Sequence, residues 1–160
     1  MSQWRERAVE GVSPGDRFSF SRAFSLGEVT AFGELTRDYN PVHYDDAFAE
    51  LKGFEGPVCH GLLTGSMICE IGGQLGWLAT RMDFFVKKPV HPGDVITCEL
   101  AVDSVDANHF ACAHARMTNQ DGLEVMAADL EGYLPDPASR ERLGQMMAEG
   151  DPTNPLRDRR

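Results

Sequence analysis

Asp38 and His43 are two side chains that can accept or donate a proton. They lie five positions apart, on either side of the bend at Asn40-Pro41. In an uninterrupted helix a spacing of five would put them on different faces. Pro41 ends the preceding helix, since the residue before a proline is disfavoured in the αR region, and the resulting turn lets both side chains point into one pocket. A carboxylate and an imidazole that share a pocket can exchange protons with a bound water. Taken alone, the same residues also fit a plain helix stop with a solvent-facing Asp and His.

A glycine opens the most apolar segment of the chain, in the run Cys59-His60-Gly61-Leu62-Leu63. The first N–H groups of a helix have no partner within the helix, and they lie at the positive end of its dipole. A carbonyl that turns into an enolate needs such a fixed donor, and glycine has no side chain to block its approach. Gly61 is therefore a candidate oxyanion-binding residue, with a simple helix-entry turn as the alternative.

Together these features resemble the MaoC-like family of (R)-specific enoyl-CoA hydratases. The family motif consists of an aromatic, an aliphatic and a small residue, then Gly-Asp, any residue, Asn-Pro, an aliphatic residue, His and a further small residue. This sequence carries it as Phe32, Leu35, Thr36, Arg37, Asp38, Tyr39, Asn40, Pro41, Val42, His43 and Ala49. The similarity includes His60-Gly61-Leu62-Leu63 and the segment at 84–94, and it covers about residues 16–134. Arg37 stands where the family usually has glycine, and a left-handed backbone there would cost on the order of 1 kcal/mol.

The resemblance implies an α+β hot-dog fold, in which an antiparallel sheet wraps around a long central helix and two subunits pair as a homodimer. It implies reversible syn addition of water to a trans-2-enoyl thioester, with Asp38 and His43 as the catalytic pair and the Gly61 N–H as the donor to the thioester oxygen. Asn40 would support the pair by fixing its turn, although an Asx-turn role alone fits equally well. The substrate would be a thioester of coenzyme A or acyl carrier protein, and neither a cofactor nor a metal ion is expected.

Two other functions are open at this point. A hot-dog thioesterase would use the same helix start to polarise the thioester but would direct water at C1, and the Asp-Tyr-Asn-Pro-Val-His run argues against it. A non-catalytic sensor of acyl thioesters would need a regulatory module, and we find no basic helix-turn-helix pattern in the sequence.

Three helices must position these groups. The first begins after Ser25, a predicted N-cap with Glu28 three positions later, and runs to about Arg37. A short second helix is predicted at 45–51, and the apolar segment 60–78 indicates a long buried helix. The buried helix contains glycines that should be matched by closely packed neighbours, namely Gly65, Gly72 and Gly73.

The rest of the domain alternates between apolar and polar residues, which is typical of antiparallel strands with one face on the core. Ile96, Cys98 and Leu100, for example, should face inward. Turn residues separate the predicted strands at 16–24, 81–90, 94–105, 109–118 and 123–134.

Length and charge limit the remaining possibilities. The 160 residues suit one domain at 1–134, followed by a short helical and polar C-terminal tail at 135–160 with a helix near 138–148. A formal charge of -10 repels phosphate backbones and anionic lipids, so we expect no nucleic-acid or membrane partner. The sequence contains no apolar run of the roughly 20 residues that a membrane span needs, and a cytoplasmic location is expected.

The cysteines and the other histidines are assigned no role in the site. None of the four cysteines forms a CxxC pair, so we interpret them as small hydrophobic residues and not as metal ligands or disulfides: Cys59, Cys69, Cys98 and Cys112. The histidines interpreted as structural or solvated are His91, His109 and His114.

Overall fold

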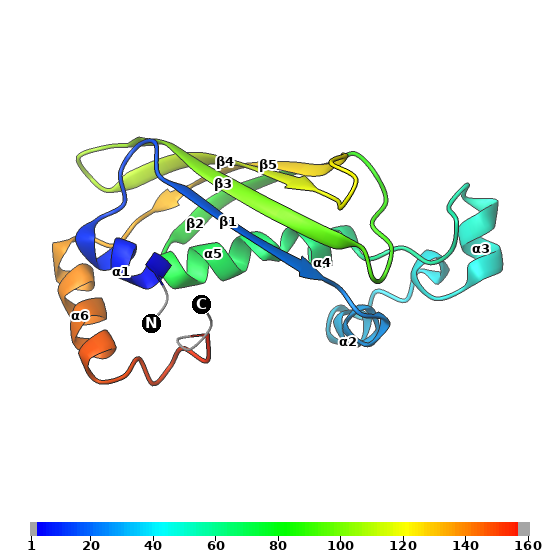
Figure 1. The fold of residues 1–160 in the computed structure, drawn as a ribbon, viewed down its shortest axis with the longest axis horizontal. Helices are drawn as coiled ribbons and strands as arrows, with labels where there is room; N and C mark the ends of the chain where they lie inside the picture. Colours follow the sequence, from blue (N-terminus) through cyan, green and yellow to red (C-terminus); the bar gives the residue numbers. More distant parts are fainter. Residues whose placement is uncertain (1–2, 157–160) are drawn as a thin grey trace.

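The computed structural model describes residues 3–156, which form one curved sheet packed on a layer of helices (Figure 1). The helices are α1 (Gln3–Glu10), α2 (Leu26–Thr36), the 3-10 turn η1 (Pro41–His43), α3 (Asp46–Leu51), α4 (Gly61–Gly65), α5 (Met67–Leu75) and α6 (Pro137–Ala148). The strands are β1 (Arg17–Ala23), β2 (Leu78–Val86), β3 (Val95–Val105), β4 (Phe110–Thr118) and β5 (Glu124–Tyr133).

All neighbouring strands of the sheet are antiparallel, in the order β1-β3-β4-β5-β2. The expected alternation is present in β3, where Ile96, Cys98 and Leu100 are buried and Glu99 is exposed. The predicted strands are found with small shifts in their bounds. The largest shift is in β2, which runs from Leu78 to Val86 and ends where the Lys87 and Lys88 N–H groups both donate to the Val125 carbonyl, so the regular ladder stops. The order leaves β1 and β2 as the two edges of the sheet.

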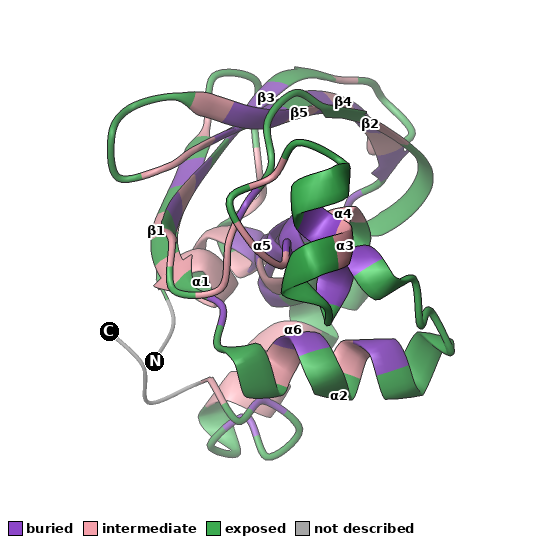
Figure 2. Ribbon diagram, turned by 90° about the vertical axis from the view of Figure 1, so that its right-hand side faces the viewer, coloured by how far each residue is buried: buried purple, intermediate pink, exposed green. Residues whose placement is uncertain are grey.

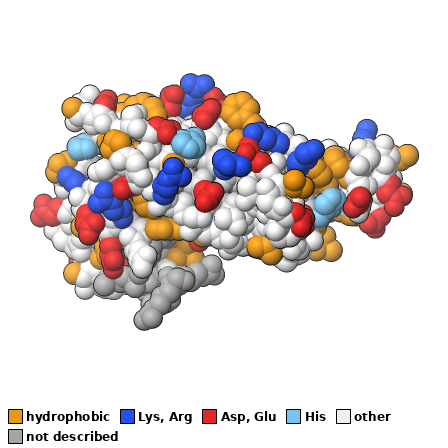
Figure 3. Space-filling view, turned by 45° about the horizontal axis from the view of Figure 1, so that its top comes forward, with side chains coloured by type: hydrophobic (Ala, Val, Ile, Leu, Met, Phe, Trp, Pro, Cys, Tyr) orange, Lys and Arg blue, Asp and Glu red, His pale blue; other side chains and the backbone are white. Residues whose placement is uncertain are grey.

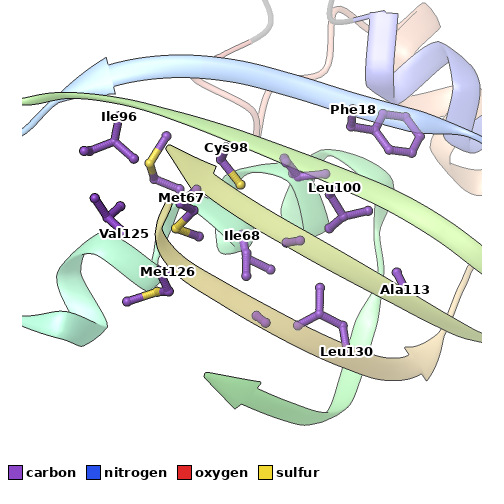
Figure 4. Close-up of a cluster of buried hydrophobic side chains, with 14 of the residues drawn as sticks. Phe18, Met67, Ile68, Ile96, Cys98, Leu100, Ala113, Val125, Met126 and Leu130 are labelled. Atoms are coloured by element: carbon purple, nitrogen blue, oxygen red, sulfur yellow. The ribbon is translucent and has the colours of Figure 1, made fainter. Parts of the chain in front are cut away.

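The central helix lies beneath the concave face of the sheet and supplies much of the core. Met67 and Ile68 lie against side chains of β3 and β5, including Cys98 and Leu130 (Figure 4). The prediction of one helix at 60–78 is corrected in two ways. Ser66 separates α4 from α5, and the helix ends at Leu75 because Gly76 adopts the left-handed conformation at φ 66°.

The three glycines of this helix differ in their surroundings. A Cβ atom added at Gly65 would lie 2.8 Å from Cε1 of Phe84, so the β2 phenyl ring packs directly on the helix backbone. Gly72 and Gly73 have no described atom within 4 Å of an added Cβ. The prediction of close packing is therefore confirmed for Gly65 and wrong for the other two, at which an added Cβ would meet open space.

Helix α2 begins and ends with specific capping contacts. Ser25 Oγ accepts a hydrogen bond from the Glu28 N–H, and the Glu28 carboxylate accepts one from the Ser25 N–H, which completes the predicted capping box. The backbone hydrogen bond from Ser25 lowers the pKa of Glu28. At the other end Arg37 adopts the left-handed conformation at φ 59°, as expected of the position that glycine usually occupies.

The N- and C-terminal helices pack together at the end of the molecule away from α2 and α3 (Figure 1). The sequence pattern did not indicate α1, whose buried contribution is mainly Ala8. The predicted helix α6 has Leu143 packed on the core, and Arg140 donates a hydrogen bond to the Glu10 carbonyl. Beyond it Asn154 is buried and exchanges two side-chain hydrogen bonds of 2.9 Å with Gln74 of α5.

Buried residues concentrate in α4, α5 and the inner strand faces, whereas α2 and α3 are largely exposed (Figure 2). The outer face of the sheet carries acidic and basic side chains close together (Figure 3). Arg81, for example, pairs with Asp83 of its own strand β2 and with Glu131 of β5. None of the described helices combines the length and the apolar composition that crossing a bilayer requires.

Candidate active site

The turn after α2 brings Asp38 and His43 together as the sequence predicts. The Asp38 N–H donates to the Gly33 carbonyl at 3.1 Å, which closes the end of α2. Asn40 Oδ1 then accepts from the Val42 N–H at 3.3 Å, an Asx-type contact that starts η1. As a result Oδ2 of Asp38 lies 3.9 Å from Nε2 of His43. This separation is too long for a direct hydrogen bond, and it suits one water held between the two groups.

The proton arrangement of His43 follows from its other ring nitrogen. Nδ1 lies 2.7 Å from the Val58 carbonyl oxygen. Because a carbonyl oxygen can only accept, Nδ1 carries the hydrogen and Nε2 of the neutral ring is left with a free lone pair. The ring is buried, with 8% of the residue exposed, so this contact also fixes its orientation. His43 therefore presents a proton acceptor toward Asp38.

His60 is a third member of the site, although its position in the sequence predicted no role for it. It is 2% exposed, and its ring stacks on that of His43 with centroids 3.8 Å apart. Nε2 of His60 lies 3.2 Å from the Asp38 carbonyl oxygen and 4.0 Å from its Oδ2. Nε2 must therefore donate, and Nδ1 is a buried acceptor without a partner among the described residues. The stacked rings thus hold opposite tautomers.

The residue after His43 also faces this cluster. The Tyr44 hydroxyl donates to the Asp38 carbonyl at 3.0 Å and lies 3.3 Å from Nε2 of His60. Burial raises the pKa of Tyr44. The phenol is therefore a hydrogen-bond donor at neutral pH, and it joins Asp38 and His60 in one network.

The same three groups are the candidate ligands for a metal ion. Asp38, His43 and His60 each offer a donor atom, and these atoms lie within 4.8 Å of one another. Zinc binds imidazole nitrogens at about 2.0–2.1 Å, along lone pairs that lie in the ring planes. Two stacked planes only 28° apart do not meet at that distance. The arrangement fits proton transfer better than metal binding, and a metal-free site stays a prediction.

Two hollows of about 270 Å³ each meet beside Gly61, with Val86 and Met126 lining both. One contains Asp38 and His60, and the rest of its lining is mostly apolar: Phe32, Thr36, Leu62 and Phe84. The other is lined by apolar residues together with Lys87 and Lys88. Gly61 is the first residue of α4, so its N–H has no partner within the helix. A thioester whose carbonyl lies at Gly61 has room for the acyl chain in one hollow and for the carrier arm in the other.

The loop that leads into α4 is held by a histidine interpreted above as solvated. Nδ1 of His91 lies 3.0 Å from the Pro57 carbonyl, and the Cys59 N–H donates to the Val90 carbonyl at 2.7 Å. His91 therefore anchors the residues just before Gly61. His114 is on the outer sheet face, where it pairs with Asp103 at 2.8 Å.

A sheet wrapped around a central helix, with a carboxylate and an imidazole facing each other at the start of that helix, defines a hot-dog enzyme. The solved (R)-hydratase of Aeromonas caviae involved in PHA biosynthesis has a TM-score of 0.73 and 31% identity, and the match covers 79% of this chain and 99% of that one. Residues 12–122 match the family described as MaoC like domain. The chain belongs to this MaoC-like family of hydro-lyases, which confirms the fold and the family expected from the motif.

Several relatives that the sequence matches are named hydratases or dehydratases. The (R)-specific enoyl-CoA hydratase of Aeromonas caviae is 30% identical over 133 residues, which are 80% of this chain and 99% of the relative. The mitochondrial 3-hydroxyacyl-[acyl-carrier-protein] dehydratase of Arabidopsis thaliana is 33% identical over 84 residues, which are 51% of each protein. The first name is that of a hydratase for a coenzyme A thioester, and the second is that of a dehydratase for an acyl-carrier-protein thioester.

Proposed function

We propose that the protein is an (R)-specific enoyl-thioester hydratase that also runs in reverse as a 3-hydroxyacyl-thioester dehydratase. The observation that supports this most is the 3.9 Å gap between Oδ2 of Asp38 and Nε2 of His43, which one water would fill. The apolar linings beside Gly61 suit an acyl chain and a pantetheine arm. The carrier is coenzyme A or acyl carrier protein, and the thioester is substrate, so the reaction needs no separate cofactor.

In the hydration direction Asp38 and His43 hold the water above C3 of the trans-2-enoyl thioester. Nε2 of His43 takes a proton from the water as the water oxygen bonds to C3. The Asp38 carboxylate accepts a hydrogen bond from the other O–H and so orients the water. The electrons of the double bond move onto the thioester oxygen, which the Gly61 N–H stabilises. The acid–base pair then returns a proton to C2 on the same face. Asn40 supports the step by holding the turn between the two groups.

We further propose that two copies pair through β2 as a homodimer. This edge strand has no described partner along its outer side, and it exposes apolar side chains on both of its faces, namely Leu78, Met82, Phe85 and Val86. An open edge with apolar side chains is completed by a partner strand. Because Val86 lines both hollows, a partner seated here would help to enclose the substrate.

The test is an assay that separates hydration from thioester cleavage. Loss of the enoyl-thioester chromophore is followed for crotonyl-CoA and longer chains on coenzyme A and acyl carrier protein, with free thiol measured in parallel. We expect loss of the chromophore without thiol release, and chiral analysis should give the (R)-3-hydroxyacyl thioester. Stoichiometric thiol release would indicate a thioesterase, and a predominantly (S) product would contradict the assignment.

A further inference from the structure

Tyr44 occupies a space that exists because residue 33 is glycine. A Cβ atom added at Gly33 would lie only 1.7 Å from the Tyr44 hydroxyl oxygen and 3.0 Å from its Cζ. Gly33 is a buried residue inside α2, where glycine is a poor helix former. No turn or left-handed backbone requires a glycine there, since Gly33 is absent from the residues with positive φ. The space for the hydroxyl is the structural reason for this glycine.

The Tyr44 hydroxyl acts on the main chain of Asp38. It donates to the Asp38 carbonyl at 3.0 Å, and Nε2 of His60 donates to the same oxygen at 3.2 Å. The Asp38 N–H is held by the Gly33 carbonyl at 3.1 Å, so both peptide groups of this residue are fixed. An added Cβ at Gly33 would also come within 3.2 Å of the Asp38 carbonyl.

The carboxylate of Asp38 depends on this main-chain anchoring. It is half exposed, and the hydrogen bond found for it is a 3.3 Å contact from the Asn40 N–H to Oδ1. The preceding residue, Arg37, is in a left-handed conformation that favours glycine. The direction of Oδ2 toward Nε2 of His43 is therefore set mainly by how the Asp38 backbone is held.

We infer that Tyr44 is a positioning residue of the acid–base pair and that Gly33 is its matched partner. The hydroxyl, admitted by the missing Cβ, holds the Asp38 carbonyl together with His60 and thereby aims the carboxylate at the water shared with His43. The effect on rate rests on the proposed function. The effect on the His60 ring does not, and it can be measured without substrate.

The first variant is Tyr44→Phe, which removes only the hydroxyl. We expect kcat to fall about threefold to tenfold, the factor that corresponds to one intramolecular hydrogen bond, while KM stays within about twofold because no substrate contact is lost. Tyr39→Phe is the matched control, since Tyr39 is an exposed tyrosine of the same turn and should keep the parent kcat. A parent kcat in folded Tyr44→Phe would overturn the inference.

The second test asks whether residues 33 and 44 act as a pair. Gly33→Ala should lower kcat at least as much as Tyr44→Phe, because the new methyl displaces the hydroxyl. The double variant Gly33→Ala, Tyr44→Phe should recover to near the level of Tyr44→Phe alone, since the oxygen that clashes is gone, and Cζ and the Asp38 carbonyl each need to move by only a few tenths of an ångström. Gly27→Ala in the same helix is the control, because its Cβ would meet only Ser25 Oγ at 3.8 Å. Losses that multiply in the double variant would contradict the pairing.

A substrate-free measurement separates this inference from the proposed function. Nitrogen-15 NMR of the imidazoles should show the Nδ1–H tautomer for His43 and the Nε2–H tautomer for His60 in the parent. Tyr44→Phe should shift the Nε2–H resonance of His60 and leave the Nδ1–H resonance of His43 unchanged. If the parent hydrates no enoyl thioester but this shift occurs, the proposed function fails and the positioning network stands. An unchanged His60 resonance would reject the network itself.

Discussion

His43 and His60 carry the same ring, yet their neighbours give them opposite proton arrangements. The Val58 carbonyl takes the hydrogen of Nδ1 in His43, whereas the Asp38 carbonyl takes the hydrogen of Nε2 in His60. Only His43 therefore offers a free Nε2 lone pair to a water beside Asp38. Backbone carbonyls, and not charged groups, decide which of two stacked histidines can act as the base.

The acid–base pair of Asp38 and His43 gives the first prediction at the scale of single residues. Asp38→Asn and His43→Ala should each lower kcat for hydration at least about a hundredfold, because general acid–base groups contribute about 10² to 10⁴. Both variants should keep the parent circular dichroism spectrum, and His114→Ala on the outer sheet face serves as the control. Near-parent turnover of crotonyl-CoA by either folded variant would show that the pair is not catalytic.

The oxyanion donor is tested by two substitutions at Gly61. His60 has φ -59° and ψ 135°, the backbone that a residue before proline prefers, so Gly61→Pro should fold while losing its N–H. Gly61→Ala keeps the N–H and adds a methyl 3.4 Å from Val86 Cγ2, which is ordinary contact. We expect kcat of the proline variant to be at least about tenfold below that of the alanine variant. Equal kcat values would assign the oxyanion to another donor.

The thiols should differ sharply in reactivity. Burial raises the pKa of Cys59 to about 11 and that of Cys98 to about 12, so both are protonated near pH 8, whereas Cys69 is exposed. Because the thiolate is the nucleophile, iodoacetamide at pH 8 should label Cys69 first. The labelling rate of Cys59 should then rise about tenfold per pH unit up to pH 10, as followed by peptide mass spectrometry. Fast labelling of Cys59 at pH 8 would show that its loop opens.

At the scale of elements, the end of α2 combines a functional constraint with backbone strain. Arg37 has φ 59° and ψ 27°, a conformation that costs a non-glycine residue about 1–2 kcal/mol. Glycine would remove this cost. Its greater conformational freedom in the unfolded chain would, however, lower the free energy of unfolding by about 0.4–1 kcal/mol. We therefore expect Arg37→Gly to raise the free energy of unfolding by about 0.5–1 kcal/mol in urea titrations. Arg37→Ala is the control and should show no gain, and equal stability of the two variants would contradict the strain.

Elements with a chemical signal of their own could be predicted from the sequence. The Ser25 and Glu28 capping box and the alternation in β3 are local patterns, and the structure contains both. The helix predicted to stop because of Pro41 ends earlier, at Thr36 with the left-handed cap Arg37, and Pro41 instead starts η1. Helix α1 escaped prediction because its burial comes from contacts with distant parts of the chain, such as Trp4 against Phe18. The early end of α5 at Gly76 is a local signal that the apolar continuation to residue 78 obscured.

In the site, too, contacts between residues close in the sequence could be predicted, whereas contacts between distant residues could not. Asp38 and His43 are close in sequence, and their approach follows from one proline turn. The contribution of His60 depends on contacts with Asp38 and Tyr44 that are 22 and 16 positions away. Its place beside Gly61 in the family motif was the signal that could have found it. The space that Gly33 leaves for Tyr44 becomes visible only when both residues are seen in three dimensions.

At the scale of the whole molecule, the β2 edge predicts the oligomeric state. Phe85 is 51% exposed on this edge, so Phe85→Lys should convert a dimer to monomers in analytical ultracentrifugation and lower kcat as the hollows beside Val86 open. Leu123→Lys is the matched control, because Leu123 is 55% exposed in the β4–β5 turn. A dimer that survives Phe85→Lys would place the interface elsewhere.

The buried amide pair of Gln74 and Asn154 ties the central helix to the last part of the described chain, 80 positions later. A chain leaves the ribosome N-terminus first, so α5 is made long before its polar partner exists. Until Asn154 has been synthesised, the Gln74 amide either stays hydrated or is buried without a partner, and the second case costs about 1–3 kcal/mol. A polypeptide that stops short of Asn154 keeps that defect permanently. The pair thus links the stability of the folded domain to the presence of the segment that carries Asn154, so a chain cut before that residue should unfold more easily.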